Sequence, residues 1–293
     1  MKQTFNLDND EKLHIYCLSD LHLGSNTCNE EYFEYALNMI KNDKSPKILY
    51  LAGDLLEIAS KKVGDSAFAQ KINVNKQIDI LINYLKPFKN IINGSVFSNH
   101  TGARTKREFD LNCDKLISNI LEIPYNHTLT DKVYINDNPY TIFVKHGNGS
   151  SNKNHLALGK IERDCASVEA DLYFMGHLHR VGAISEVYIK DEEYKRKTFV
   201  LTGSFLSYKN SYAQYQGLSP IPEAFTRVDV DKDLNTSVNV YNIAVVAPEL
   251  MKKCIDNMID DYTVYHNLQD YLLSRRYTII LNKYPHENLR EFY

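Results

Sequence analysis

Short apolar runs that break at glycine or at polar residues recur along this chain of 293 residues. Their length and their richness in isoleucine, leucine, valine and tyrosine are typical of buried strands. Five such runs precede acidic, amide or imidazole side chains, and they lie at residues 13–18, 47–52, 91–97, 141–145 and 171–175. Apolar residues at helical spacing predict helices between them, at 30–40, 67–88, 110–121 and 154–168. This alternation of strands and helices predicts an α/β protein.

Beyond residue 180 the pattern changes to strands without intervening helices. We predict that they form a second, antiparallel sheet from segments 183–189, 198–202, 225–231 and 237–243. The charged run 190–197 is then the solvated tip of a hairpin. Segment 203–222 is too long for a plain connector, and its tyrosines either pack the loop or stack on a base. From Pro248 onward, apolar residues recur at helical spacing.

This pattern predicts two domains. The main domain covers residues 1–246, and a C-terminal helical extension covers residues 247–293. The extension either docks on the main domain or forms an oligomer contact, so a homo-oligomer through the C-terminal helices is one expectation.

Composition narrows the functional classes. The formal net charge is -3, so no global basic field draws the chain to nucleic acid, although local contacts stay open. No apolar run is long enough to span a membrane. The N-terminal residues are polar and lack the apolar core of a secretory leader. Five scattered cysteines without a C-x-x-C pair indicate reduced thiols. We therefore expect a cytoplasmic protein that does not contact a membrane.

The residues that follow the five strands are of metal-ligand types. The Gly-His-x-His sequence after the fifth strand should occur by chance only roughly 0.01 to 0.02 times in a chain of this composition. The first two strands flank a helix, which makes them parallel and brings their carboxyl ends to one edge of a sheet. In chain order the polar residues at strand ends are Asp20, His22, Asp54, Asn99, His100, His146, His177 and His179. Taken singly, each pair is equally compatible with an ordinary polar loop.

Together, these side chains favour a transition-metal site. Imidazoles, carboxylates and an amide oxygen suit Mn²⁺, Fe or Zn²⁺, and there are too many ligands for one ion. Two cations about 3.5–4 Å apart can lower the pKa of a bridging water and clamp both ends of a phosphoryl displacement. Arg104 belongs to a local cationic group with Lys106 and Arg107. That group is either a solvated basic face or a phosphate clamp, a role for which arginine is geometrically suited.

The same residues resemble those of the calcineurin-like metallophosphoesterase family over roughly residues 13–245. A finer likeness is to phosphoesterases of unknown substrate encoded by phages and related bacterial elements. It is carried by the Asn-His segment followed by arginine and by Gly203-Ser204-Phe205. The resemblance implies two stacked mixed β-sheets flanked by helices, a four-layer sandwich.

The resemblance also implies roles for single residues. Asp20, His22 and His179 would bind one metal, Asn99, His146 and His177 would bind the other, and Asp54 would bridge them. His100 is then left to stabilise the transition-state charge or to protonate the leaving oxygen. Two positions depart from the family pattern: Ser98 stands where glycine is usual, and Thr101 stands where an acid is usual. The missing acid weakens the argument that His100 is an acid, but not the argument for the metal site.

We therefore predict an enzyme that hydrolyses a phosphoester with two divalent metal ions and a metal-bridging hydroxide. Manganese is the favoured metal, with iron or zinc as alternatives. A phosphodiester such as a nucleic acid or nucleotide is the favoured substrate, and Arg104 is the candidate substrate-binding residue. The alternative is a phosphomonoesterase, including a protein phosphatase. A more remote alternative is a binding scaffold that kept the fold and lost the chemistry.

Overall fold

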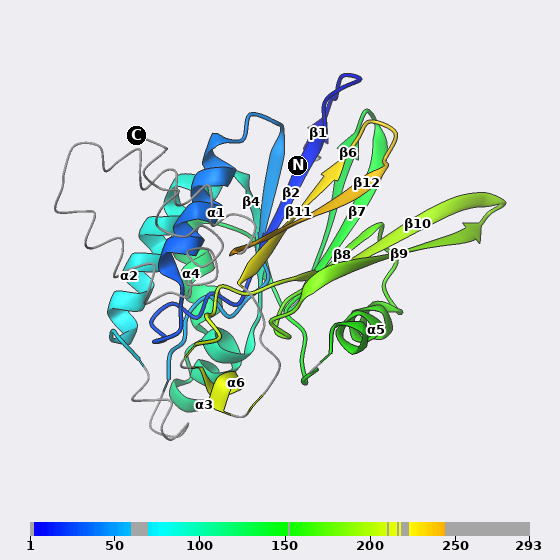
Figure 1. The fold of residues 1–293 in the computed structure, drawn as a ribbon. Helices are drawn as coiled ribbons and strands as arrows, with labels where there is room; N and C mark the ends of the chain where they lie inside the picture. Colours follow the sequence, from blue (N-terminus) through cyan, green and yellow to red (C-terminus); the bar gives the residue numbers. More distant parts are fainter. Residues whose placement is uncertain are drawn as a thin grey trace, which may run out of the picture. The chain divides into compact units, whose positions relative to one another are not determined.

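Two mixed β-sheets of six strands each form the centre of the chain in the computed structural model (Figure 1). The structure describes residues 3–59, 70–151, 153–209, 211–215, 217 and 223–243. Sheet A has the strand order β1-β6-β7-β8-β10-β9, and sheet B has the order β12-β11-β2-β3-β4-β5. Sheet A consists of β1 (Gln3–Phe5), β6 (Leu129–Ile135), β7 (Asn138–Lys145), β8 (Leu172–Met175), β9 (Val181–Lys190) and β10 (Glu193–Thr202). Sheet B consists of β2 (Leu13–Leu18), β3 (Lys47–Leu51), β4 (Ile92–Val96), β5 (Tyr125–Asn126), β11 (Ala224–Val230) and β12 (Thr236–Asn242).

The main core lies between the two sheets. Apolar side chains from both sheets share one buried cluster, with Ile15 and Tyr50 from sheet B and Val144 and Phe174 from sheet A. Burying aliphatic side chains contributes about 25 cal/mol per Å² of apolar surface removed from water. The buried faces therefore hold the sheets together and fix the relative position of their strand ends.

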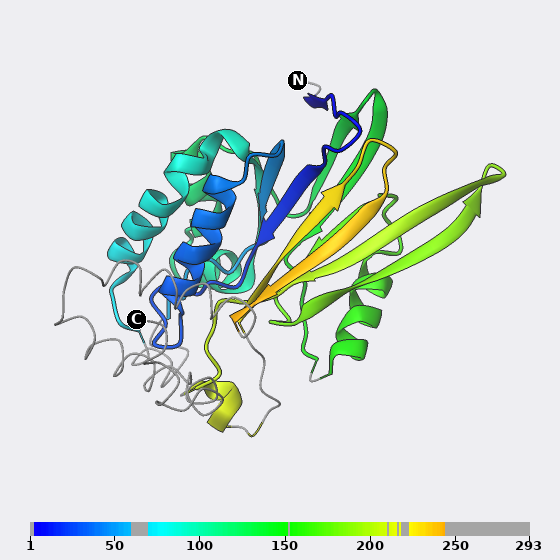
Figure 2. The ribbon, with the colours of Figure 1, turned by 45° about the horizontal axis from the view of Figure 1, so that its top comes forward.

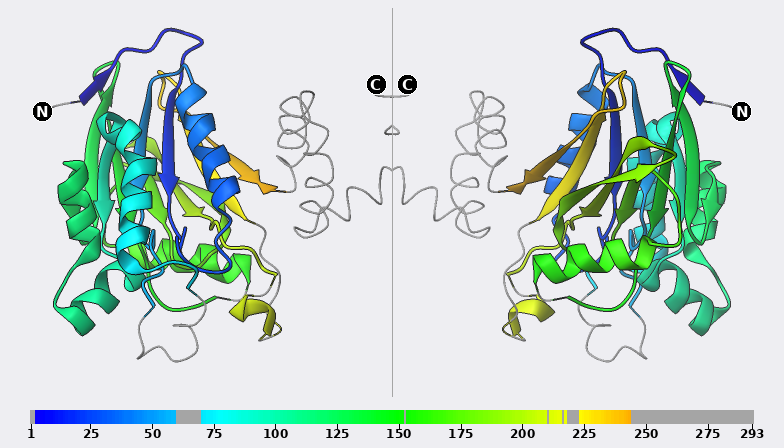
Figure 3. Two further views of the ribbon diagram at one scale, coloured as in Figure 1. Left: turned by 90° about the vertical axis from the view of Figure 1, so that its left-hand side faces the viewer. Right: turned by 90° about the vertical axis from the view of Figure 1, so that its right-hand side faces the viewer.

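Helices cover the outer faces of both sheets (Figures 1, 2 and 3). On the side of sheet B lie α1 (Glu30–Asn42), α2 (Val74–Leu85) and α4 (Cys113–Leu121), and on the side of sheet A lies α5 (Asn154–Cys165). The shorter helical pieces are a 3₁₀ turn (Lys86–Ile91), a π-helical turn (Asn99–Arg104), α3 (Thr105–Phe109) and α6 (Tyr212–Tyr215). The predicted fold class, α/β with two stacked mixed sheets flanked by helices, is confirmed.

Asparagine side chains set the starts of α1, α2 and α4. The Oδ1 atom of Asn29 accepts the backbone N–H of Tyr32, and that of Asn73 accepts the N–H of Lys76. Such caps satisfy amide groups that have no partner within the helix. The helix predicted over 67–88 is shorter in the structure because the Asn73 cap starts it at Val74.

The four strands expected in one antiparallel sheet are instead divided between both sheets, so that prediction was wrong. Strand β10 pairs parallel to β8 and antiparallel to β9, which extends sheet A. Strand β11 pairs antiparallel to β2, which extends sheet B together with β12. The predicted charged hairpin is present: Asp191 and Glu192 form its two-residue turn, with φ of 52° and 64°. Positive φ at both positions matches the turn type that suits twisted strands.

Met1–Ala244 forms one compact unit, and Val245–Tyr293 forms a second. The predicted helical extension, residues 247–293, lies outside the described residues. Among the helices that are described, none combines the length and the apolar character needed to cross a membrane.

Candidate metal centre

The loops after five strands bring the seven predicted metal ligands together. The predicted parallel pairing of β2 with β3 is confirmed, and β4 with β3 and β7 with β8 also pair parallel. In sheet B, Asp20 and His22 follow β2, Asp54 follows β3, and Asn99 follows β4. In sheet A, His146 follows β7, and His177 and His179 follow β8. The carboxyl ends of parallel strands thus supply every one of these residues, as expected for α/β sheets.

Most of these residues hold left-handed backbone conformations. Five of the seven have positive φ: Asp20 at 53°, His22 at 48°, Asp54 at 48°, His177 at 69° and His179 at 52°. Aspartate and histidine enter this region more readily than most residues, but each still costs roughly 1 kcal/mol. Strained backbone of this kind clusters at functional sites, where the surrounding structure holds it in place.

Two glycines allow the loops to approach closely. A Cβ atom added at Gly53 would lie 2.4 Å from the Cβ of Ser98 and 2.9 Å from Nδ1 of His146. A Cβ atom added at Gly176 would lie 2.8 Å from Oδ2 of Asp20. Any side chain at either position would push apart the loops that carry the candidate ligands.

The first group of candidate ligands is Asp20, His22 and His179, whose ligand atoms all lie within 4.8 Å of one another. The Nδ1 atom of His22 lies 2.9 Å from Oε2 of Glu57, and a carboxylate can only accept, so Nδ1 carries the hydrogen. The lone pair of His22 Nε2 therefore faces the group. It lies 3.3 Å from Nε2 of His179, which itself lies 3.3 Å from Oδ1 of Asp20.

The second group is Asp54, His146 and His177, again within 4.8 Å. His146 Nδ1 donates to the carbonyl oxygen of Ala52 at 2.8 Å, so Nε2 faces Oδ2 of Asp54 at 3.0 Å. His177 Nε2 donates to the carbonyl oxygen of Gly149 at 2.7 Å. Its Nδ1 atom lies 3.1 Å from Nδ2 of Asn99, which places the predicted amide ligand at this group.

The donor sets of both groups fit divalent transition-metal ions. The buried atoms Asp20 Oδ1 and His146 Nε2 have no hydrogen-bond partner among the described residues. The Nε2 atom of His22 carries a lone pair rather than a hydrogen, and it faces the Nε2 atom of His179. Buried polar atoms without partners are rare in proteins, and here they point into the same small region. A cation between them would satisfy all of these atoms.

The charges at this centre depend on one another. Burial alone would lower the pKa of His146, but the Asp54 carboxylate outweighs burial and raises the pKa to about 9. Burial works in the opposite sense on Asp54, and the charge of His146 holds the pKa of that carboxyl well below its ordinary value. Burial would also lower the pKa of His22, which Glu57 raises instead. Protons on these imidazoles supply positive charge that offsets the negative charge of the carboxylates. A bound divalent cation would supply that positive charge instead.

Glu57 is a residue of this site that the sequence analysis did not find. Its carboxylate accepts from His22, lies 3.4 Å from Nδ1 of His100 and lies 3.5 Å from Nη1 of Arg104. Although Glu57, His22 and His100 form a third group of ligand-type atoms, the His22 contact is made by the protonated nitrogen. We therefore assign Glu57 to the support of His22, as carboxylates commonly support metal-binding histidines. The sequence feature that could have identified Glu57 is its position three residues after Asp54.

His100 lies beside the metal centre with its backbone N–H on Oδ1 of Asp54, at 2.7 Å. The Thr101 hydroxyl accepts the N–H of Leu56 at 3.1 Å and lies 3.2 Å from the carbonyl oxygen of Leu56. Thr101 therefore ties the loop of His100 to the loop of Glu57. Thr101 stands where the family usually has an acid, and the carboxylate next to His100 in this structure is that of Glu57.

Arg104 lies next to His100. Its Nη1 donates to the carbonyl oxygens of Glu57 at 3.0 Å and of Ile58 at 3.3 Å. Its Nη2 lies 3.2 Å from Nε2 of His100. Most of the guanidinium is thus engaged with the loop after β3, and the group that faces the site is Nη2.

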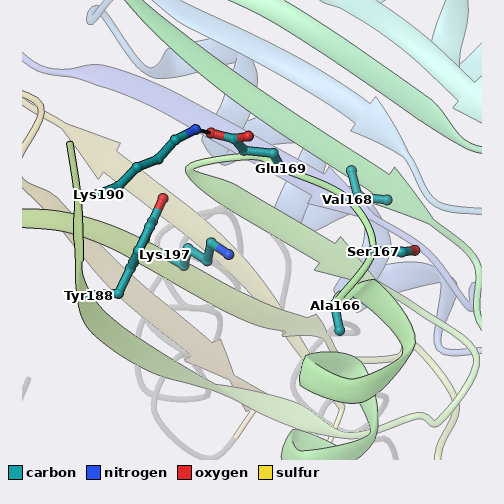
Figure 4. Close-up of a pocket in the computed structure, with 7 residues that line it drawn as sticks. All are labelled: Ala166, Ser167, Val168, Glu169, Tyr188, Lys190 and Lys197. Carbon is teal, nitrogen blue, oxygen red and sulfur yellow. Dashed lines mark hydrogen bonds and ion pairs between the residues drawn. The ribbon is translucent and has the colours of Figure 1, made fainter.

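A cavity of about 330 Å³ lies elsewhere, between the end of α5 and the β9–β10 hairpin (Figure 4). Its lining residues are Ala166, Ser167, Val168, Glu169, Tyr188, Lys190 and Lys197. Lys190 forms an ion pair with Glu169, and Nζ of Lys197 lies 4.6 Å from the centroid of the Tyr188 ring. None of the predicted site residues lines this cavity, so it is not part of the metal centre.

Neither a family model nor a curated protein matches the sequence. Similar solved structures include a conserved uncharacterized protein from Streptococcus pneumoniae, described as a predicted phosphoesterase. The two sequences are 14% identical. The match covers 79% of this chain and 98% of the other protein's chain, with a TM-score of 0.35. A double mutant of Vps29 from Entamoeba histolytica is 13% identical over 79% of this chain and 98% of its own, with a TM-score of 0.36. Vps29 from Chaetomium thermophilum is 11% identical, and the match covers 78% of this chain and 97% of the Vps29 chain, with a TM-score of 0.34. At this degree of similarity neither name transfers to this chain.

Proposed function

We propose that this protein hydrolyses a phosphoester, with a phosphodiester such as a nucleic acid or nucleotide as the favoured substrate. The observation that carries the proposal is the convergence of seven ligand-type side chains from five strand ends, with buried atoms that lack partners. Asp20, His22 and His179 would hold one divalent ion, and Asn99, His146 and His177 the other, with Asp54 between them. Manganese is the favoured metal because the ligand set mixes nitrogen and oxygen. When bound, the ions would supply an activated water and would neutralise charge on the phosphoryl group.

The chain's own residues have distinct tasks in this proposal. Glu57 fixes the ring of His22, so that Nε2 faces the centre. His100 meets the substrate, where it protonates the leaving oxygen or stabilises charge on the phosphoryl oxygens. Arg104 contributes positive charge beside His100 through Nη2. The four described cysteines are buried free thiols, which suits the reducing conditions of the cytoplasm.

A substrate panel tests the proposal. The full chain, freed of metal with a chelator, is supplied with Mn²⁺, Fe²⁺, Zn²⁺ or Mg²⁺ and assayed on bis(p-nitrophenyl) phosphate and p-nitrophenyl phosphate. We expect turnover of the diester that requires added transition metal. Faster turnover of the monoester would favour the phosphomonoesterase alternative. Binding of two metals without turnover of any phosphoester would favour a scaffold.

A further inference from the structure

Asp114, in the first turn of α4, is a buried carboxylate behind the loop of Asn99. Only 3% of the residue is exposed. Its Oδ2 atom accepts the backbone N–H of Ser98 at 2.7 Å and the Ser98 hydroxyl at 2.9 Å. Its Oδ1 atom lies 3.2 Å from the same hydroxyl. None of the ion pairs among the described residues includes Asp114, and the hydrogen bonds of its carboxylate all go to one neighbour, Ser98.

The fit around this carboxylate is close. A Cβ atom added at Gly102 would lie 2.4 Å from Oδ2 of Asp114 and 2.8 Å from the Phe97 ring. Glycine at position 102 therefore lets the π-helical turn reach the carboxylate.

Keeping an acid at this position is unfavourable by itself. Burial, and then the charge of Asp54, raise the pKa of Asp114 to about 7. An acid in the first turn favours a helix, but an exposed acid would serve α4 equally well. A buried acid without a cationic partner is retained where it fixes something specific. The segment that it contacts begins one residue before Asn99.

We propose that Asp114 is a positioning residue for Asn99 and His100, acting through Ser98. The inference rests on the proposed function, because it assumes that Asn99 is a metal ligand. Asp114 holds the start of the π-helical turn, while Thr101 holds its middle to Leu56. Between these two attachments, Asn99 faces His177, and the His100 N–H reaches Asp54. Ser98, which departs from the usual glycine, gives the carboxylate a second donor.

Metal binding by the full chain tests this role independently of catalysis. Mn²⁺ is titrated calorimetrically into metal-free wild type, Asp114→Ala and Asp114→Asn. For Asp114→Ala we expect one of two Mn²⁺ affinities to fall about 10- to 100-fold, the range for lost support of a ligand, and kcat to fall with KM little changed. Asn keeps an oxygen that accepts the Ser98 N–H, so Asp114→Asn should keep both the Mn²⁺ affinity and kcat close to their wild-type values.

Asn112→Ala is the matched control. The Asn112 side chain accepts the N–H of Lys115 at 3.1 Å and caps the same helix without touching Ser98. We expect this variant to lower the Tm and to leave both Mn²⁺ affinities and kcat unchanged. If Asp114→Ala behaves like Asn112→Ala, Asp114 only stabilises the fold and the inference is overturned.

Ser98→Ala provides a second route if Asp114→Ala does not fold. It removes the hydroxyl and keeps the N–H, so its effect on metal affinity should be smaller and in the same direction. Where Asp114→Ala folds, its effect and that of Ser98→Ala should be non-additive, since both act on one contact. Strict additivity would overturn the inference. If the affinities shift as expected but wild type hydrolyses no phosphoester, the proposed function fails and the positioning role stands.

Discussion

The two sheets contribute different chemistry to the metal centre. Sheet B supplies every carboxylate, from Asp20, Asp54 and Glu57, whereas the sheet A loops supply only the imidazoles of His146, His177 and His179. Carboxylates attract any divalent cation, and imidazoles favour transition metals over magnesium or calcium. In the proposed centre we therefore expect sheet B, which also supplies His22, to determine mainly how tightly ions bind, and sheet A to determine mainly which ions bind.

The largest effect is expected from the shared carboxylate of sheet B. Asp54→Ala removes the carboxylate proposed to bridge the two groups, which is also the carboxylate that His146 Nε2 faces. We expect loss of both metals and a fall in turnover of at least about 10³-fold, measured by elemental analysis and phosphodiesterase assay. A purified variant with two metals and near-wild-type turnover would show that the ligand assignment is wrong.

The matched variant from sheet A is His177→Ala. It removes a neutral ligand of the second group only, so we expect one metal to remain bound and selectivity for Mn²⁺ over Mg²⁺ to narrow. If this variant loses as much metal as Asp54→Ala, the two sheets do not differ in the way proposed.

His100 follows a sheet B strand but is not expected to bind metal. Because an alkoxide leaving group needs a proton far more than p-nitrophenolate does, His100→Ala should slow alkyl or nucleotide esters by about 10²-fold or more and p-nitrophenyl esters much less. Both metals should stay bound. Equal slowing of both substrate types would point to electrostatic stabilisation. Loss of one metal would make His100 a ligand.

Glu57 is a further carboxylate on the side of sheet B, and it supports the candidate ligand His22. Glu57→Leu removes the acceptor of His22 Nδ1, and we expect about a 10- to 100-fold loss of metal affinity by calorimetry. Glu57→Gln keeps an oxygen acceptor and serves as the control, with a smaller loss. Equal metal affinity in wild type and Glu57→Leu would argue against this support.

The smallest effect is expected at Arg104, which lies outside both ligand groups. Arg104→Ala should lower kcat/KM by about 10-fold with unchanged metal content, because one charge-assisted contact to a phosphate is lost. Arg104→Lys should recover little, since lysine lacks the planar group that binds both carbonyl oxygens through Nη1 and presents Nη2 beside His100. An unaltered kcat/KM would mark Arg104 as a purely structural residue.

Much of this arrangement could be predicted from the sequence because it is encoded locally. Each candidate ligand directly follows an apolar run, and the helix between β2 and β3 makes those strands parallel. The carboxyl ends therefore had to meet, whatever the details of the remaining fold.

What could not be predicted depends on contacts between distant segments. Strand β10 pairs with β8, and β11 pairs with β2, a partner about two hundred residues away; no local pattern specifies such choices. Glu57 was missed for the same reason, since only the tertiary structure brings it to His22 and His100. The sequence shows that no acid follows His100 directly, but not that Glu57 lies beside it or that Thr101 joins two loops.

The left-handed backbone at the candidate ligands has a consequence for how this protein tolerates change. Glycine adopts such conformations without strain, so replacing a ligand by glycine relieves the backbone while it removes the function. For His179→Gly, at a φ of 52° and with a third of the side chain exposed, we expect the metal-free variant to be at least as stable as the metal-free wild type. Stability alone would therefore favour glycine at these positions over the candidate ligands.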